Sequence, residues 1–324
     1  MRLALAYRSS MVLFAATELE LFTSIARGAS TAERLAEERT APMEPLRLLL
    51  ESCVAEGLLT RDGDRYANTP VADAFLVRDR PTYAGHALKY AADLYEPWSR
   101  LSDLVRTGRP TIEPDTILGD DKEKTRAFVL AMHERAKGMH AVLPHGADFT
   151  GRRRLLDVGG GPATYSMALV QHYPGLTSTV LDLPGVLDVT RELVDQHGFA
   201  DRIELRPGNY LTTPFGSGYD AVLLSGMMHR ETPETCQTLL RKAYDALNPG
   251  GLVVVSDVFF EDDQKNSPPF AIHFALNMML TSNEGSAHAK TEMARWMAGA
   301  GFGQVALRGL PPPNPHTLVT GLKP

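Results

Sequence analysis

Three consecutive glycines, Gly159 to Gly161, follow a short apolar segment that predicts a β-strand over residues 154–158. Glycines at a strand end let the backbone approach a ligand, and the helix predicted over residues 163–172 offers unpaired N–H groups at its start. The run therefore predicts a site for a nucleotide-like ligand. It matches neither G-x-G-x-x-G nor a phosphate-binding loop, which disfavours a dinucleotide or a triphosphate. Tight packing of strand against helix is the alternative role.

Two acidic residues accompany this turn. Asp182 closes the next predicted strand, 21 residues after Gly161, where nucleotide-binding α/β sheets place the acidic residue that binds the ribose hydroxyls. Asp157, near the end of the first strand, is placed to hold a cationic or amine part of the ligand. Capping of the neighbouring helix is the alternative for each carboxylate.

The elements that must position these residues alternate between strand and helix from residue 152 onward. Strands are predicted over residues 154–158, 178–182, 203–206, 219–226 and 252–257, with a last extended segment near Val305. Helices are predicted over residues 163–172, 186–197, 233–247 and 291–300. The alternation predicts an α/β fold with a parallel sheet, a Rossmann-like domain over residues 151–324.

The first 80 residues predict helices followed by a hairpin at Asp62 and Gly63, an outline typical of a winged helix. Residues 81–150 are interpreted as a helical linker that contributes to the substrate pocket, interrupted between Gly108 and Asp115. The apolar helices around residues 11–22 and 46–54 have few partners within 80 residues. We therefore expect both to be buried between the two subunits of a homodimer.

Composition narrows the class of protein further. A formal charge of -6 over 324 residues gives no basic surface for nucleic acid. Two distant cysteines, Cys53 and Cys236, are no disulfide framework and favour a cytoplasmic location. No apolar run reaches the length of about 18 residues that suggests a membrane span. His133, His140 and His145 lack the partners that a metal site needs, so no metal is expected.

Five motifs then occur in a fixed order, at residues 157–162 (DVGGGP), 181–184 (LDLP), 208–210 (GNY), 228–231 (MHRE) and 247–251 (LNPGG). With the winged-helix outline before them, they make nearly the whole chain resemble the class I S-adenosylmethionine-dependent O-methyltransferases of the caffeate and acetylserotonin type. The resemblance implies a homodimeric enzyme of secondary metabolism. It would use S-adenosylmethionine to methylate a hydroxyl of an aromatic or polyketide-like small molecule.

The resemblance also implies where the cofactor binds. Gly159 and Gly161 would let its methionine part approach, and Asp182 would hold the ribose. Asn209 and Tyr210 would lie along the adenine; the family usually has Asp at the position of Asn209, but an amide oxygen still accepts a hydrogen bond. The predicted cofactor-binding set is Asp157, Gly159, Gly160, Gly161, Asp182, Leu183, Asn209, Tyr210 and Ser225.

His229 matches the position of the family's catalytic base, and it follows a predicted strand at the edge where α/β sheets bind ligands. A phenol with a pKa near 10 must lose its proton to attack well at neutral pH, and a neutral imidazole is a suitable acceptor. Asp257 stands where the family has the acidic residue that orients the base. A loop histidine hydrogen-bonded locally is the alternative for His229.

A helical stripe that follows Pro268 and Pro269 would form the substrate wall of this family, with core packing as an equal alternative. Two residues of the helix predicted from about Lys124 join it, although core packing is the favoured role of that helix. The predicted substrate set is Met132, His133, Phe270, His273, Phe274, Asn277 and Met278.

The chain departs from the family pattern at two places. The family's second carboxylate falls near Ala287, with Glu284 and His288 as the nearest polar residues. Arg230 and Glu231 replace the usual Asp-Trp after the histidine. The missing carboxylate favours a rival function, an enzyme of the same fold that binds S-adenosylmethionine without transferring its methyl group, such as a hydroxylase or a cyclase.

The residues give less support to a C-methyltransferase and to a DNA-binding regulator. A C-methyltransferase stays open because the sequence does not name the acceptor atom. A regulator would use the winged helix to bind DNA. Its expected recognition helix, residues 45–56, carries only Arg47 as a basic residue beside Glu51 and Glu56, which suits phosphates poorly.

Overall fold

The computed structural model describes residues 1–112, 121–312 and 314–324, and the chain divides into two compact units, residues 1–95 and 96–324. The predicted interruption between Gly108 and Asp115 lies partly outside the described residues. Within them, Gly108 ends a helix in the left-handed conformation. None of the described helices is long and apolar enough to cross a membrane.

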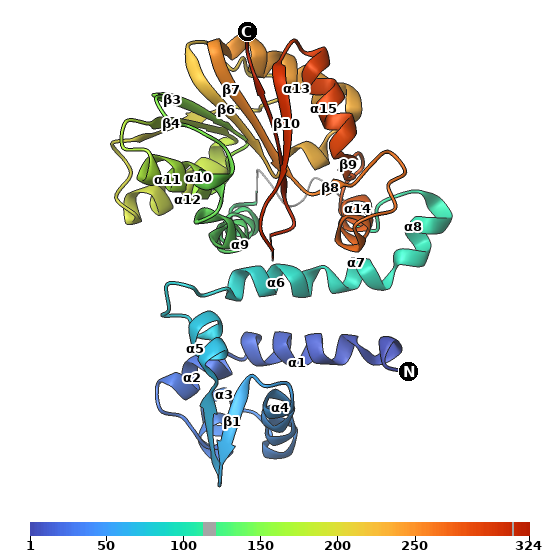
Figure 1. Ribbon diagram of the computed structural model, residues 1–324. Helices are drawn as coiled ribbons and strands as arrows, with labels where there is room; N and C mark the ends of the chain where they lie inside the picture. The colour runs from blue at the N-terminus through green and yellow to red at the C-terminus, as the bar shows by residue number, and fades with distance from the viewer. Residues whose placement is uncertain (113–120, 313) are drawn as a thin grey trace. The chain divides into compact units, whose positions relative to one another are not determined.

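The first unit is mainly helical (Figure 1). Its hairpin pairs Asp62 with Arg65, so Gly63 lies in the two-residue turn, with a φ of 58°. The elements are η1(Leu3–Leu5), α1(Tyr7–Glu18), α2(Leu21–Ala26), α3(Ala32–Arg39), α4(Met43–Ala55), β1(Leu59–Asp62), β2(Arg65–Asn68), α5(Pro70–Leu76) and α6(Gly85–Asp93), and α7(Tyr95–Ser99) spans the boundary.

This unit has a core of its own. Phe22 of α2 and Leu46, Leu50 and Cys53 of α4 are buried within it. The expectation that both apolar helices need a second subunit to be covered is therefore wrong for α4 and for the end of the first apolar segment. The reason is that α5 and the hairpin supply the missing partners, through Ala72, Leu76, Leu59 and Tyr66.

The second unit contains a seven-stranded sheet in the order β10-β11-β7-β6-β3-β4-β5. Its elements are α8(Leu101–Thr107), α9(Lys122–His140), α10(Leu143–Gly146), β3(Arg154–Val158), α11(Thr164–His172), β4(Thr177–Asp182), α12(Pro184–Gln196), β5(Ile203–Pro207), β6(Tyr219–Ser225), η3(Met228–Arg230), α13(Pro233–Ala246), β7(Leu247–Asp257), β8(Phe259–Phe260), α14(Pro269–Thr281), β9(His288–Ala289), α15(Lys290–Gly299), β10(Gly303–Gly309) and β11(Thr317–Leu322).

Five of the seven strands are parallel, as predicted, but β10 and β11 are antiparallel. Strand β11, which was not predicted, lies between β10 and β7 and pairs Thr317 with Asp257. β11 is short, follows a proline-rich segment and pairs with residues far away in the chain, so its local sequence does not indicate a strand.

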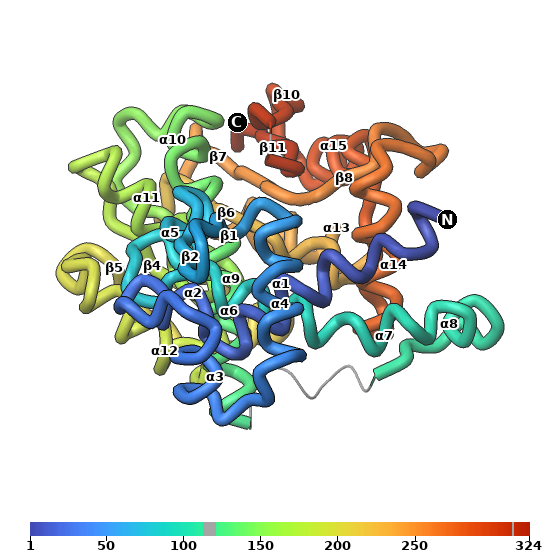
Figure 2. The backbone as a smooth tube through the Cα atoms, turned by 90° about the horizontal axis from the view of Figure 1, so that it is seen from below, coloured from blue at the N-terminus to red at the C-terminus, as the bar shows by residue number. Residues whose placement is uncertain are grey.

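Alternation along the strands separates two apolar layers. Leu155, Leu223 and Val254 face α10 and α11, whereas Leu156, Leu224 and Val255 face α13 and α15 (Figure 1). Helix α9 contacts both α11 and α12 (Figure 2). Both faces of the central strands are covered, which explains their nearly continuous apolar sequences.

The chain direction across the sheet reverses between β3 and β6. From β3 the chain adds β4 and β5 on one side, then returns to place β6 and β7 on the other. In open α/β sheets the crevice outside the carboxyl ends of the strands at such a point is where ligands bind. The glycine turn after β3 and the segment that carries His229 after β6 both start there.

Candidate active site

The turn after β3 requires glycine for two different reasons. Gly159 has a φ of 63°, and its N–H donates to the carbonyl of Leu181 (2.8 Å). Gly160 packs directly on the carboxyl group of Asp157: a Cβ atom there would lie 2.7 Å from the Asp157 Cγ. Beside Gly161 a Cβ atom would meet nothing within 4 Å, so the turn has open space on that side.

The carboxylate of Asp182, at the end of β4, stabilises this turn by hydrogen bonds. Its two carboxylate oxygens accept hydrogen bonds from the backbone N–H groups of Gly161 (2.8 Å) and Leu183 (2.7 Å). Burial raises the pKa of Asp182, and these two hydrogen bonds and the charge of Arg230 oppose that rise. Leu183 joins the predicted site through its backbone, while its side chain packs against an apolar cluster that includes Val129 and Val186.

Two buried polar atoms beside the turn have no hydrogen-bond partner among the described residues. They are Oδ1 of Asp157 and the hydroxyl oxygen of Ser225, at the ends of the neighbouring strands β3 and β6. The other Asp157 oxygen accepts a hydrogen bond from Ser166 (2.6 Å), a residue that the sequence analysis missed. Buried polar atoms without partners are rare, and a ligand with a cationic, hydrogen-bonding group would satisfy both. The ammonium group of S-adenosylmethionine fits this requirement.

The predicted adenine segment contains a hydrogen bond that the sequence analysis missed. The Tyr210 hydroxyl donates to the buried carboxylate of Glu231 (2.6 Å), and the Tyr210 ring lies beside Gly159. Burial, and then Glu231, raises the pKa of Tyr210, so the hydroxyl keeps its proton. Asn209 is exposed, and its side-chain oxygen accepts from the N–H of Leu211 (2.9 Å), which shapes the loop.

His229 and Asp257 are joined in the structure. His229 Nδ1 lies 2.8 Å from one carboxylate oxygen of Asp257, and the His229 backbone N–H donates to the other (3.2 Å). The Asp257 carboxylate is almost fully buried. Burial alone would raise its pKa, but the His229 charge and hydrogen bond, the nearby His316 and the N–H of Val258 outweigh that effect and lower it. An ionised carboxylate accepts from Nδ1–H, which leaves Nε2 of the ring as a proton acceptor.

No carboxylate replaces the family's second one near His229 in the part of the chain that the structure describes. Ala287 is buried, and Glu284 is exposed. His288 is buried, and its Nε2 lies 3.1 Å from the carbonyl oxygens of Met228 and Glu231. The His288 ring therefore stabilises the η3 turn that carries His229. It does not serve as an acidic partner of the base.

Helix α14 brings the predicted substrate residues together. The Phe274 ring packs edge-on against the His229 ring, with 4.8 Å between centroids, and Phe270 stacks on Phe274 at 6.4 Å. His273 and Asn277 both contact Trp98 of α7, a residue that the sequence analysis missed. Met278 is buried. Phe274 thus lies against the candidate base, and positions 273 and 277 of the same helix lie against Trp98.

Met132 and His133 lie apart from this group, on α9. His133 is buried, its Nδ1 lies 2.8 Å from the Thr164 hydroxyl at the start of α11, and its ring packs against that of His197. Burial lowers the pKa of His133 to about 4, so the ring is neutral at physiological pH. The contacts of His133 therefore lie on the side of the glycine turn, and none of them is with α14.

Within the described ranges, no group of three His, Cys, Asp or Glu side chains could hold a metal ion.

Comparisons with known proteins identify the family of the chain. A family model for the O-methyltransferase domain matches residues 98–303, and one for the O-methyltransferase dimerisation domain matches residues 1–78. The chain belongs to this O-methyltransferase family. Family membership confirms the predicted Rossmann-like fold, the predicted enzyme class and S-adenosylmethionine as the cofactor.

The chain is similar to relatives along its whole length. It is 31% identical to 3-hydroxy-5-methyl-1-naphthoate 3-O-methyltransferase from Streptomyces sahachiroi, over 97% of this chain and 92% of that protein. It is also 31% identical to the tetracenomycin polyketide synthesis 8-O-methyl transferase of Streptomyces glaucescens, over 100% and 96%. The crystal structure of human N-acetylserotonin methyltransferase in complex with SAM superposes with a TM-score of 0.89 at 25% identity, over 99% of this chain and 96% of that chain.

The carboxyl group of Asp157 predicts pH-dependent cofactor binding. Burial raises its pKa to about 7, Ser166 opposes the rise and Asp182 adds to it. A cationic ligand stabilises the carboxylate, so affinity for S-adenosylmethionine should rise about tenfold from pH 6 to pH 8, with proton release on binding below pH 7.

Without ligand, the protonated Asp157 carboxyl group stabilises the folded state. This contribution to the free energy of unfolding is largest below about pH 4 and is lost as the pH rises through about 7.

Calorimetry at both pH values, in buffers of different ionisation enthalpy, measures the affinity and the released proton. Asp157→Asn should bind weakly with little pH dependence, whereas Asp245→Asn, at an exposed site on α13, should behave as wild type. Equal wild-type affinity at pH 6 and pH 8 would contradict the prediction.

Proposed function

We propose that this enzyme methylates a hydroxyl oxygen of an aromatic or polyketide-like small molecule, with His229 as general base and Asp257 as the residue that orients it. The observation that carries the proposal is the contact of 2.8 Å between His229 Nδ1 and the buried Asp257 carboxylate. The names of the two Streptomyces relatives support an aromatic or polyketide-like acceptor.

S-adenosylmethionine, when bound, supplies an electrophilic methyl group on a sulfonium. The protein's own residues act on the acceptor. Asp257 holds the tautomer in which Nδ1 carries the proton, so Nε2 of His229 accepts the proton of the acceptor hydroxyl as its oxygen becomes the nucleophile. The ionised Asp257 then stabilises the imidazolium that forms. Holding two reactants in line can itself supply roughly 7–11 kcal/mol of the barrier.

Helix α14 contributes orientation and exclusion of water. Phe274 lies edge-on to the imidazole, which fixes the ring plane and gives an aromatic acceptor an apolar surface beside the base. Phe270 extends that surface but is 51% exposed. A flat acceptor that covers both rings would remove apolar surface from water, which favours binding.

One observation supports a second candidate, an enzyme of the same fold that binds the cofactor without methyl transfer. The position of the family's second carboxylate falls near Ala287, and His288 Nε2 lies against backbone carbonyls of the η3 turn. Incubation with S-adenosylmethionine labelled on its methyl group and a library of phenols, naphthols and polyketide aromatics separates the two. A gain of one labelled methyl group on oxygen, seen by mass spectrometry, supports the first candidate. A product without label supports the second.

The dimerisation-type first domain supports a homodimer, and α1 is the surface we expect to mediate it. Met11 and Phe14 of α1 are half-exposed and lie outside the core cluster of that unit, and Tyr7 is exposed. Light scattering should give the mass of a dimer. Phe14→Glu should shift it toward monomer because a charge would be desolvated at the interface.

A matched charge at an exposed position, Ala67→Glu on β2, should leave the dimer intact. A wild-type monomer at micromolar concentration with a folded first domain would contradict the prediction.

A further inference from the structure

The Asn277 side chain has a fixed orientation. The indole N–H of Trp98 donates to the Asn277 side-chain oxygen over 2.9 Å. An indole nitrogen is a donor only, so the amide atom that faces it must be the oxygen. The amide nitrogen makes no hydrogen bond to any described residue, and it therefore remains available as a donor.

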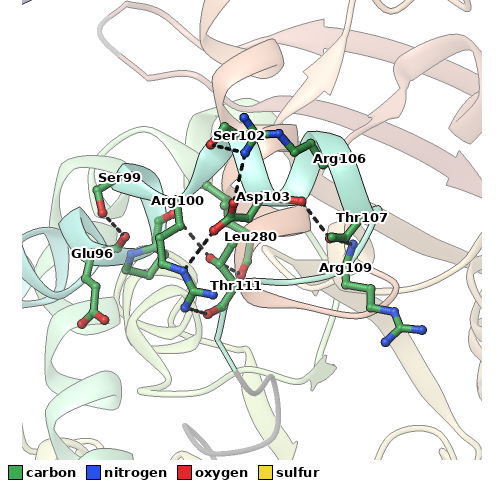
Figure 3. A network of polar contacts seen from close by, with 11 residues as sticks. Glu96, Ser99, Arg100, Ser102, Asp103, Arg106, Thr107, Arg109, Thr111 and Leu280 are labelled. Carbon is green, nitrogen blue, oxygen red and sulfur yellow. Dashed lines mark hydrogen bonds and ion pairs between the residues drawn. The ribbon is translucent and has the colours of Figure 1, made fainter.

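The segment that carries Trp98 is tied to α14 at a second place (Figure 3). The Thr111 N–H donates to the carbonyl of Leu280 near the end of α14 (3.1 Å), and Arg100 donates to the Thr111 carbonyl (2.9 Å). Thr111 is buried, and its hydroxyl lies 3.4 Å from the carbonyl of Pro97. These hydrogen bonds fix the Trp98 indole relative to the Asn277 amide. The orientation of the amide is therefore set before a substrate binds.

Asn277 lies on the same face of α14 as the ring that packs on the base. It follows Phe274 by three residues, a rise of about 4.5 Å along the helix axis. Phe274 contacts His229, and His273, one turn before Asn277, also lies against the Trp98 ring. Asn277 is thus separated by just under one helical turn from the ring that packs on the base.

We infer that Trp98 and Asn277 together select aromatic acceptors that carry, in the part of the molecule that lies along α14, a second oxygen that accepts a hydrogen bond, such as a ketone, quinone or carboxylate oxygen. The inference rests on the proposed function and names its substrate class. An acceptor oxygen takes the Asn277 N–H, whereas a donor or an apolar group at that place leaves this N–H unpaired, which weakens binding. Trp98 acts through Asn277 and is a positioning residue.

A matched pair of probes tests this selectivity. 3-Hydroxyacetophenone carries a ketone oxygen meta to its hydroxyl, and 3-ethylphenol has nearly the same shape without that oxygen. Their dissociation constants are measured by ligand-observed NMR titration of the full-length enzyme saturated with S-adenosylhomocysteine. The ratio of the two constants cancels any general loss of affinity or of folded protein.

The wild-type enzyme should bind the ketone more tightly than 3-ethylphenol. Asn277→Asp keeps the acceptor for Trp98 but has no N–H donor, so the ratio should fall about tenfold. Trp98→Phe keeps an aromatic ring but frees the amide to turn, so the ratio should fall about threefold. Arg106→Ala, at an exposed position on α8, is the control and should leave the ratio at the wild-type value.

A ratio that stays at the wild-type value in both Asn277→Asp and Trp98→Phe would overturn the inference. A wild-type ratio near one would overturn it as well. Methyl transfer is not part of this measurement. If the ratio behaves as expected and labelled methyl transfer to every acceptor fails, the binding preference for an oxygen that accepts a hydrogen bond stands, and the proposed function does not.

Discussion

Replacement of His229 by alanine is expected to lower kcat on a phenolic acceptor by roughly 10²- to 10⁴-fold, the usual contribution of a positioned general base. The affinity for S-adenosylmethionine should stay nearly unchanged, because the glycine turn and Asp182 lie on β3 and β4. The variant should regain part of its rate as the pH approaches the phenol pKa near 10, where solution supplies the phenolate. Single-turnover kinetics across pH 7–10 measure both effects.

His229→Asn separates the chemical role from a structural one. The Asn side-chain N–H can still donate to Asp257, which would otherwise lose the partner that lowers its pKa. This variant should be more stable than His229→Ala and just as slow at neutral pH. Wild-type kcat in either variant would mean that proximity alone drives transfer or that the reaction is not O-methylation.

Asp257→Asn is expected to lower kcat roughly 10- to 10³-fold, less than the loss of His229 itself. The neutral amide no longer stabilises the imidazolium. It can also present its NH₂ group to Nδ1, which would favour the tautomer with the proton on Nε2, where the base must be empty. KM for the cofactor should change little, because Asp257 lies at the end of β7, away from the glycine turn.

The control for this prediction is Asp220→Asn at the start of β6. Asp220 accepts from the N–H groups of Arg153 and Arg154 (2.9 and 3.1 Å), so its loss should cost stability without a comparable loss of kcat. Thermal unfolding and initial rates on the same preparations compare the two variants. An Asp257→Asn enzyme with wild-type kcat would exclude Asp257 as the residue that orients the base.

The sequence allowed prediction of features formed by neighbours in the chain. Gly159 to Gly161 directly follow a strand, and Asp182 ends the next one, so local pattern and the geometry of parallel sheets were enough to place them together. The pairing of His229 with Asp257 was predicted from the family resemblance. The structure accounts for it, because Asp257 ends β7 and His229 follows the adjacent strand β6.

Features that depend on distant contacts were not predictable in the same way. Trp98 contacts Asn277 across 179 residues of chain, and β11 pairs with β7 after a proline-rich segment. Glu231 was noted only as a departure from the family, because its role needs Tyr210, which approaches it through folding. His288 was one of the two polar residues nearest to the position of the missing carboxylate, but its burial and its contacts with the η3 turn could be learned only from the structure.

The residues that hold His229 in place differ from those that would contact the acceptor, so evolution can change the two sets independently. The residue is held by Asp257 through both backbone and ring, by Ser286, whose N–H donates to the His229 carbonyl (2.8 Å), and by the His288 contacts with the same turn. The proposed acceptor wall, by contrast, is one face of α14. Under the proposed function, substitutions at positions 270, 273 and 277 should therefore exchange one aromatic substrate for another while the contacts that hold His229 stay in place. A small number of mutations on one helix is the expected route to a new acceptor.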